Sequence, residues 1–275
     1  MNLTIGCTRT PKPPLRYEFG ACEPWRSSKE MKQIKYTFYG DLLGIGAAYK
    51  LGPSTAYEKL NAFYNETFAT LDTFCDNPGN EVEMFSDSLF IKGDDAVTAI
   101  ADIALVFSNL LRKGLLLRGA IVSGKLSFDT RLTKPNFTKR LPDDDTLARA
   151  AGLEKMQKGA RFLVEPQLAN ELLSTVPDWQ THEGYLRSIC SAVDDSLRRI
   201  CPTPDSMSFE YLYYWSKDVK IGEYATRTKD LKAIMAMCDK ASREHYGETI
   251  ALLERSRHRH KTTMERLEQG GGHIR

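Results

Sequence analysis

Three short segments decide the fold of this 275-residue chain: IKYTFYGDLLG at residues 34–44, VEMFSDSLFI at residues 82–91 and LLLRGAIV at residues 115–122. Each is apolar and β-rich, and each is bounded by glycine or by polar turn residues. The first segment predicts a strand over residues 34–40, and the third predicts a strand over residues 115–122. The second predicts a tight hairpin, because two apolar runs flank the tripeptide Ser86-Asp87-Ser88.

Two helices are predicted between these strands. Residues 53–76 carry apolar side chains at intervals of mostly three and four, with Pro53 at the start. Residues 96–111 follow Asp94 and Asp95 and precede Gly114, as expected for a helix with acids at its start and glycine at its end. The order β-α-β-β-α-β is that of a ferredoxin-like unit, with both helices on one face of an antiparallel sheet. The sequence therefore predicts an α+β fold with a ferredoxin-like core.

The rest of the chain predicts three regions: an irregular, proline-containing arm over residues 1–30, a main domain over 31–226 and a helical C-terminal extension over 227–275. Further elements of the main domain are a helix over 145–158, a strand over 161–164 and a short helix over 165–173. Residues 177–226 give no clear pattern. Residues 228–269 predict one long polar helix or a helix pair, before the glycines at 270–272.

Composition limits the function classes. The 38 Lys and Arg against 36 Asp and Glu give a net charge of +2, which is too balanced for a dedicated nucleic-acid binder. The first 20 residues lack the apolar run of a signal peptide, and no segment has the length of a membrane span, so we expect a cytoplasmic protein with no membrane contact. The six cysteines form no CxxC pair, so we expect reduced thiols and no zinc site.

Two acidic residues are placed where chemistry is expected. Asp41 follows the first strand, and Asp87 lies at the hairpin tip; in a ferredoxin-like sheet these points meet at one edge. A carboxylate pair there can hold two divalent cations, one at an attacking oxygen and one at the leaving phosphates. Taken singly, each residue is equally typical of a loop or a turn. The combination with the topology favours a metal site.

These segments resemble class III nucleotidyl cyclases. FYGDLLGIG is similar to their metal-binding first strand, FSDSLFI to their second metal hairpin and LRGAIVSGKL to the strand and turn that follow. DDDTLARAAGLEK resembles their helix of substrate residues, so the similarity spans residues 34–173. The resemblance implies that residues 31–226 are a cyclase domain in which Asp41, Asp87 and the Leu42 carbonyl bind Mn²⁺ or Mg²⁺, two cations per site. The separation of the metal acids on the early strands from the substrate residues on the later helix further predicts a homodimer, with each active site composed of residues from both chains.

The later helix departs from the purine cyclases. Where adenylyl and guanylyl cyclases place an asparagine and an arginine, this chain has Ala148 and Gly152, and neither side chain stabilises charge. The pyrimidine (uridylate and cytidylate) cyclases of bacterial anti-phage defence resemble this chain more closely, since they keep the LRGA strand and an Arg-Ala step, here Arg149-Ala150. The resemblance therefore makes Arg149 a candidate catalytic residue. Arg118, a charge within an otherwise apolar strand, and Lys125, which follows Gly124, are candidate substrate contacts. A solvated helix charge at Arg149 and a strand-end salt bridge at Arg118 are the alternatives.

Base choice is predicted from Glu83 and Tyr39. Adenylyl cyclases usually place lysine at the position of Glu83, whereas an ionised glutamate accepts hydrogen bonds. An acceptor suits the N3–H of uracil, although it also suits guanine and cytosine. The bulky Tyr39 and Phe85 favour a short pocket and hence a pyrimidine. We therefore expect a uridylate cyclase that prefers UTP to CTP and makes cyclic UMP as a second messenger in antiviral defence.

Three alternatives stay open at this point: a purine cyclase, a catalytically silent domain that senses a nucleotide or a protein partner, and a polymerase-like palm with the same fold. Ala148 and Gly152 favour the silent domain, whereas the two retained aspartates oppose it. Palms commonly carry adjacent acids on the hairpin, and Ser86-Asp87-Ser88 offers one acid.

Overall fold

The computed structural model of the chain describes residues 33–129, 131, 136–137, 139–175, 186–188, 209–211 and 220–269. Within these ranges a seven-stranded sheet has the order β2-β3-β1-β4-β5-β7-β6. Its strands are β1 (Tyr36–Leu42), β2 (Glu81–Phe85), β3 (Ser88–Gly93), β4 (Leu117–Ser123), β5 (Phe162–Val164), β6 (Leu186–Ser188) and β7 (Phe209–Tyr211).

The first four strands are the predicted ferredoxin-like unit. Strand β1 pairs antiparallel with β3 on one side and with β4 on the other, and β2 pairs antiparallel with β3. Strand β5 adds to β4 in the parallel direction. The α+β class and the strand order expected from the sequence are confirmed.

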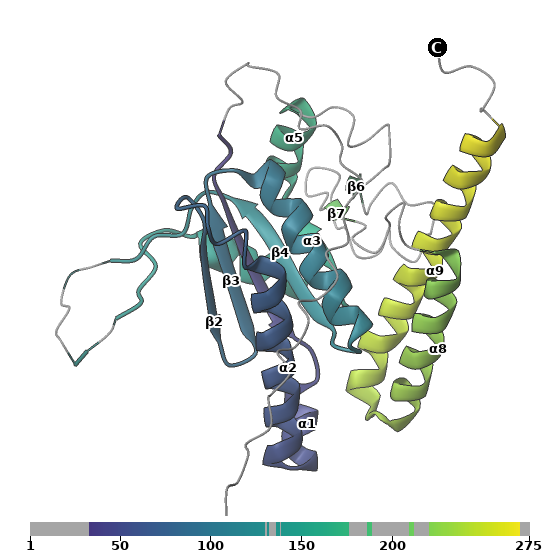
Figure 1. Cartoon of the computed structure of the whole chain (residues 1–275). Coiled ribbons are helices and arrows are strands. Elements are labelled where there is room, and N and C mark those ends of the chain that lie inside the picture. Colours follow the sequence, from purple (N-terminus) through teal and green to yellow (C-terminus); the bar gives the residue numbers. More distant parts are fainter. Residues whose placement is uncertain are drawn as a thin grey trace, which may run out of the picture. The chain divides into compact units, whose positions relative to one another are not determined.

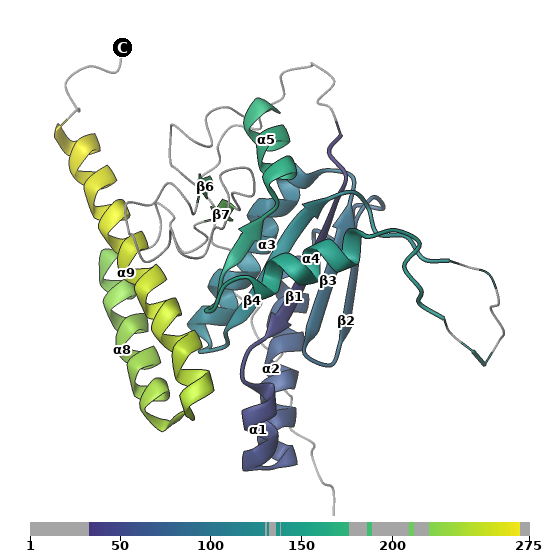
Figure 2. The same ribbon diagram turned by 180° about the vertical axis from the view of Figure 1, so that it is seen from behind.

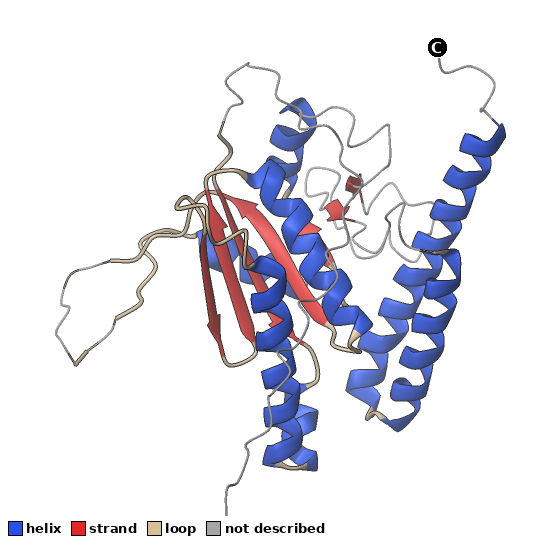
Figure 3. Cartoon of the chain, viewed as in Figure 1, coloured by secondary structure: helices blue, strands red, loops and turns tan. Residues whose placement is uncertain are grey.

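Helices cover both faces of the sheet to different extents. The helices are α1 (Ile45–Leu51), α2 (Pro53–Leu71), α3 (Ala96–Arg112), α4 (Thr146–Lys155), α5 (Pro166–Thr175), α8 (Ile221–Met237) and α9 (Lys240–Gln269). Figure 1 shows α2 and α3 on one face of the sheet. Figure 3 shows the same layers, with helices in blue and strands in red. The reverse view in Figure 2 shows α4 crossing the opposite face near β1 and β4. The second face is therefore covered by α4 over part of its width, and β2 and β3 form its more open part.

The core under α2 and α3 depends on close aromatic packing. The ring of Phe38 on β1 contacts the rings of Phe107 and Phe162 edge-on, with centroids 6.0 and 5.6 Å away. A Cβ on Gly119 of β4 would lie 2.4 Å from the Phe38 ring, closer than any real contact. Glycine in the LRGA segment is thus required by packing, because the Phe38 ring occupies the space of a side chain.

The C-terminal helices share this core. Residues 228–269 were predicted as one polar helix or a pair, and they lie in the pair α8 and α9, which begins at Ile221. Tyr224 and Leu231 of α8 and Leu252 and Leu253 of α9 are buried in the main hydrophobic cluster. The described part of the chain contains no helix with the length and apolarity needed to cross a membrane.

Other differences from the sequence predictions are local. Helix α1 was not predicted, since three glycines lie between residues 44 and 52. Strand β1 begins and ends two residues later than expected. The predicted arm over residues 1–30, most of the unassigned region 177–226 and the glycines at 270–272 lie outside the described residues.

Candidate metal centre

The two predicted acids meet where β1 ends and the β2–β3 hairpin turns. Asp41 is the Cα partner of Ser88 on β3, one residue from Asp87. The amide of Leu42 donates a 2.8 Å hydrogen bond to the carbonyl oxygen of Asp87, which ties the hairpin tip to the strand end. Ser86 adopts a left-handed backbone conformation with φ 54°, and this lets the chain reverse within two residues. Leu42 itself is buried, so its part in the site is limited to its main chain.

Negative charge accumulates around Asp41. Burial, followed by the nearby carboxylates Asp87 and Glu154, raises the pKa of Asp41 to about 6, whereas Arg118 and Lys155 oppose the shift. Arg118 is the Cα partner of Asp41 on β4. Asp41 therefore lies among two other carboxylates and two basic side chains.

Glu154 and Lys155, at the end of α4, are residues that sequence reasoning missed. Glu154 is buried with 1% of its surface exposed, and it accepts a hydrogen bond from Nε of Arg118. A signal was present in the sequence: Glu154 shares the apolar face of α4 with Ala150 and Leu153, and Arg118 lies in an otherwise apolar strand. A buried acid and a buried base on neighbouring elements are each other's natural partners.

The donor set fits a hard divalent cation. Mg²⁺ and Mn²⁺ prefer oxygen ligands, and the Asp41 and Asp87 carboxylates lie close enough to interact electrostatically, with the main chain of Leu42 beside them. Burial first, and then the neighbouring carboxylates, raise the pKa of Asp41, and a bound cation would favour its ionised form. Among the described residues, no group of three or more His, Cys, Asp or Glu side chains is arranged to hold a metal ion, so protein side chains alone do not complete a coordination shell.

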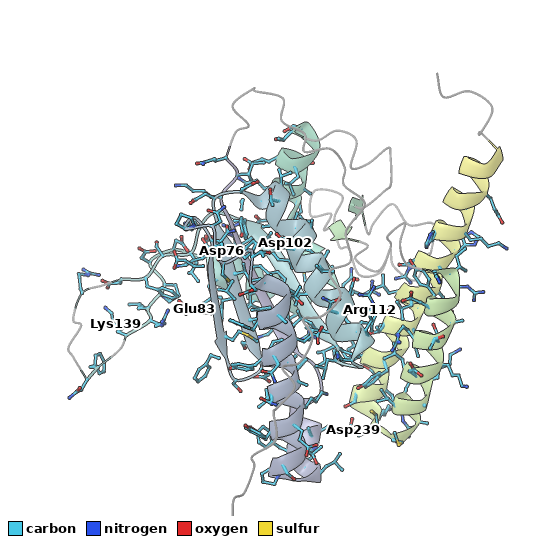
Figure 4. All side chains as sticks on the ribbon, in the orientation of Figure 1. Asp76, Glu83, Asp102, Arg112, Lys139 and Asp239 are labelled. Atoms are coloured by element: carbon cyan, nitrogen blue, oxygen red, sulfur yellow. The ribbon has the colours of Figure 1, made fainter. Side chains whose placement is uncertain are left out.

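The residues predicted to contact the base lie on the same face of the sheet as Asp41, in the row that contains Tyr39, two residues before Asp41 on β1. Tyr39 pairs with Phe90 of β3, and Phe90 pairs with Glu83 of β2, so the three form one row across the sheet. The Tyr39 and Phe90 ring centroids are 5.2 Å apart. Glu83 forms an ion pair with Arg140, and their side chains are 37% and 55% exposed, respectively. Figure 4 shows Glu83 on the side of the sheet from which the loop carrying Lys139 extends.

Lys125 and Arg149 lie at the other end of the sheet. From Arg118 to Ser123, β4 rises by roughly 17 Å. Lys125 follows Ser123 and binds the carbonyl of Gly79 and the carboxylate of Asp94, each at 3.0 Å.

Arg149 is also engaged within the chain. Its Nη2 donates to the carbonyl of Ser123 at 2.8 Å, its Nε donates to Asp145 at 3.1 Å, and its Nη1 donates to Glu165. The structure therefore brings Asp41, Leu42, Asp87, Arg118 and Tyr39 together, with Glu83 nearby. It places Arg149 and Lys125 elsewhere in the same chain.

Neither a protein-family model nor a curated protein matches the sequence. Solved structures that resemble this one are adenylyl and guanylyl cyclases. The adenylyl cyclase CyaB from P. aeruginosa is 15% identical over 65% of this chain and 93% of its own, with a TM-score of 0.48. An adenylate cyclase from Trypanosoma brucei is 12% identical over 68% of this chain and 93% of its own, with a TM-score of 0.48. The guanylate cyclase domain of RhGC from Catenaria anguillulae, in complex with GTP, is 11% identical over 66% of this chain and 96% of its own, with a TM-score of 0.46.

Proposed function

We propose that this protein is a nucleotidyl cyclase that converts a ribonucleoside triphosphate into a 3′,5′-cyclic nucleotide and pyrophosphate. The observation that carries the proposal is the meeting of Asp41 and Asp87, fixed by the bond between the Leu42 amide and the Asp87 carbonyl. Two carboxylates beside each other at the end of β1 and the tip of the hairpin suit a site for metal-bound phosphates.

In this reaction the ribose 3′-hydroxyl attacks the α-phosphorus, and pyrophosphate leaves. Mn²⁺ or Mg²⁺, held by Asp41, Asp87 and the Leu42 carbonyl, would supply charge neutralisation and would lower the pKa of the attacking hydroxyl. The chain's own contribution is mainly positioning. Arg118 brings a positive charge beside Asp41, while Tyr39 and Phe90 offer an apolar surface on which a base can lie.

We further propose a homodimer with composite sites. Arg149 and Lys125 lie too far from Asp41 to act in the same site of one chain, so a catalytic role for them requires a second chain. The more open part of the second sheet face, with Phe85 78% exposed, is the surface that we assign to this contact.

The proposed substrate is a pyrimidine triphosphate, UTP ahead of CTP, and the proposed role is second-messenger synthesis in anti-phage defence. Glu83 supports the base preference as an acceptor on the row of Tyr39 and Phe90. Its partner Arg140 is an exposed residue, and such pairs contribute little, so a base N–H can replace Arg140 at small cost.

The decisive experiment incubates the purified protein with all four ribonucleoside triphosphates at equal concentration and Mn²⁺, with products identified by mass. We expect cyclic UMP to dominate, with cyclic CMP second. Dominant cyclic AMP or cyclic GMP would refute the pyrimidine preference and leave the cyclase activity intact. Selectivity that is unchanged in Glu83→Lys would show that Glu83 does not choose the base.

A second candidate is a nucleotide-sensing domain without turnover. It is favoured by Ala148 and Gly152 on α4 and by Arg149, whose three nitrogens all bind partners in the same chain. This candidate predicts that the protein binds a triphosphate in the presence of Mn²⁺ and releases no cyclic product.

A further inference from the structure

Four consecutive residues of the connection between α4 and β5 each bind a side chain of α9. The pairs, in chain order along the connection, are Lys158 with Glu244, Gly159 with His245, Ala160 with Thr249 and Arg161 with Glu248. On α9, residues 244 and 248 are one helical turn apart, and so are residues 245 and 249. One face of α9 therefore holds the whole connection.

The connection begins close to the proposed active site. Glu154 and Lys155, the last two residues of α4, both act on the charge of Asp41. The amide of Met156 then donates a 3.1 Å hydrogen bond to the carbonyl of Leu153 and closes the last turn of the helix. Because the connection follows so soon after this turn, its position fixes the position of the end of α4.

The contact with His245 differs from the other three because it depends on a proton. Nδ1 of His245 accepts a hydrogen bond from the amide of Gly159 at 3.2 Å. An imidazole nitrogen accepts only in the neutral form, whereas both nitrogens of the imidazolium are donors. Gly159 is buried, so protonation of Nδ1 would leave a buried amide without its acceptor.

The charges around His245 also oppose its protonation. In the described part of the chain, the charged groups that act on it are Arg118 of β4, Lys158 of the connection and Glu244 on its own helix. Burial, followed by Arg118 and Lys158, lowers the pKa of His245 below its ordinary value of 6.5, and Glu244 opposes this shift. The stability from this contact is therefore complete above pH 6.5 and is lost as pH falls below it, since the released histidine binds the proton first.

We propose that His245 is a positioning residue of the proposed active site: its neutral imidazole holds the α4–β5 connection, and with it the end of α4, and protonation releases both. The inference rests on the proposed function for the reaction that α4 serves. It assigns no chemical step to His245, which acts through the connection.

Hydrogen exchange at two amides, followed by NMR on the full chain, tests the release directly. The amide of Gly159 reports on the contact with His245, and the amide of Met156 reports on the end of α4. The key variant is His245→Asn, because Oδ1 of asparagine occupies the same place along the side chain as Nδ1 of histidine and does not titrate. The matched control is His258→Asn, which removes an exposed histidine from the same helix.

Each exchange rate of the wild type is divided by the rate in His245→Asn at the same pH. This ratio cancels the intrinsic pH dependence of exchange, and Asp41 and Asp102, whose pKa values are near 6, are present in both proteins. We expect both amides to exchange within twofold of each other's variant at pH 7.5. At pH 5.5 we expect exchange about three- to tenfold faster in the wild type, since one pH unit shifts a proton-linked equilibrium by up to about tenfold.

The His258→Asn control should exchange as the wild type does at both pH values. Equal exchange of wild type and His245→Asn at pH 5.5 would overturn the proposal. A difference at Gly159 without one at Met156 would also overturn it, because the contact would then not position the end of α4.

Cyclic nucleotide formation provides the second test, through rescue by the conservative variant. His245→Ala lacks the acceptor at every pH, so we expect its kcat at pH 7.5 to be about three- to tenfold below that of the wild type, whereas His245→Asn should stay within twofold. Full activity of His245→Ala would contradict the positioning role. If His245→Ala does not fold, the exchange ratios decide the proposal. Absence of cyclic product from every variant and the wild type would refute the cyclase function alone, since hydrogen exchange does not depend on turnover.

Discussion

Asp41 and Asp102 are two half-buried aspartates whose pKa values are both raised to about 6, for partly different reasons. Burial accounts for the shift of Asp102 on α3, whereas Asp41 adds the repulsion of Asp87 and Glu154 to its burial. A raised pKa by itself therefore does not identify a functional acid. Asp41 differs from Asp102 because the carboxylate of Asp87 lies beside it and because it lies at the end of a strand.

Removing either site acid should abolish activity and preserve the fold. We expect Asp41→Asn and Asp87→Asn to reduce cyclic nucleotide formation by more than about 100-fold, because each removes a ligand of the proposed metal site. Asp102→Asn is the control and should keep activity within a few fold. Near wild-type turnover of either site variant at saturating Mn²⁺ would contradict the metal assignment.

Asp102 should also make the protein less stable as pH rises. Its folded pKa is about 6 and its ordinary value is lower, so between these values the folded chain holds a proton that the unfolded chain has lost. Stability from this group is therefore present at low pH and is lost as pH rises through about 6. Asp102→Asn should be more stable than the wild type at pH 8 by about 1 kcal/mol, after allowance for solvent screening, and equal to it near pH 4.

Urea denaturation at the two pH values measures this difference. The wild type measured in parallel is the reference, and Asp102 is labelled in Figure 4. A stability gain that is the same at pH 4 and pH 8 would rule out titration of Asp102 as its cause.

At the scale of elements, helix α9 is docked on the connection between α4 and β5. Thr249 accepts from the amide of Ala160 at 2.9 Å, and His245 accepts from the amide of Gly159 at 3.2 Å. Lys158 and Arg161 add ion pairs to Glu244 and Glu248. This short connection follows directly after Glu154, so the docking of α9 bears on the end of α4 that faces the site.

A substitution at Gly159 should disturb the contact between α9 and this connection. Its φ is +93°, and an added Cβ would lie 3.0 Å from Cβ of Glu248 and 3.1 Å from the amide nitrogen of Thr249. We expect Gly159→Ala to destabilise the protein by about 1–3 kcal/mol. Gly247→Ala is the control within α9, because its added Cβ meets no described atom within 4 Å, and it should stabilise by about 0.5–1 kcal/mol. Chemical denaturation of the two variants side by side tests the contrast, and equal effects would contradict it.

At the scale of the whole molecule, the separation of Arg149 from Asp41 makes the proposed dimer testable. Chains with Asp41→Asn should recover activity when mixed with chains carrying Arg149→Ala, since one of the two composite sites in a mixed dimer is then intact. The control mixes Asp41→Asn with Asp87→Asn chains, in which each site has lost an acid, and no recovery is expected. A monomer by light scattering, or verified mixed dimers without recovery, would exclude shared sites.

The sequence predicted the strands of the sheet better than the position of α4 on the second face of the sheet. Alternating burial, glycine and turn residues define β1 to β4 locally, and the antiparallel order followed from them. The face covered by α4 was not predictable, since an apolar stripe on a helix does not say which side of a sheet it contacts. Glu154 was missed for a related reason: its partner Arg118 lies 36 residues away in sequence, and only the fold brings them together. Two of the three partners of Arg149, Ser123 and Glu165, and both partners of Lys125 are likewise distant in sequence.

The hydrogen bond from Nη1 of Arg227 to the carbonyl of Arg112 joins residues that are 115 apart in sequence, so the two partners are synthesised at different times. A ribosome adds about 5–20 residues per second, so α8 emerges on the order of ten seconds after α3. During that interval the apolar surface that later meets Tyr224 and Leu253 is without its cover. Nascent chains that hold the sheet but not α8 and α9 should therefore recruit chaperones, and the protein should gain the proposed activity after the sheet has been synthesised, when the helix pair closes the core.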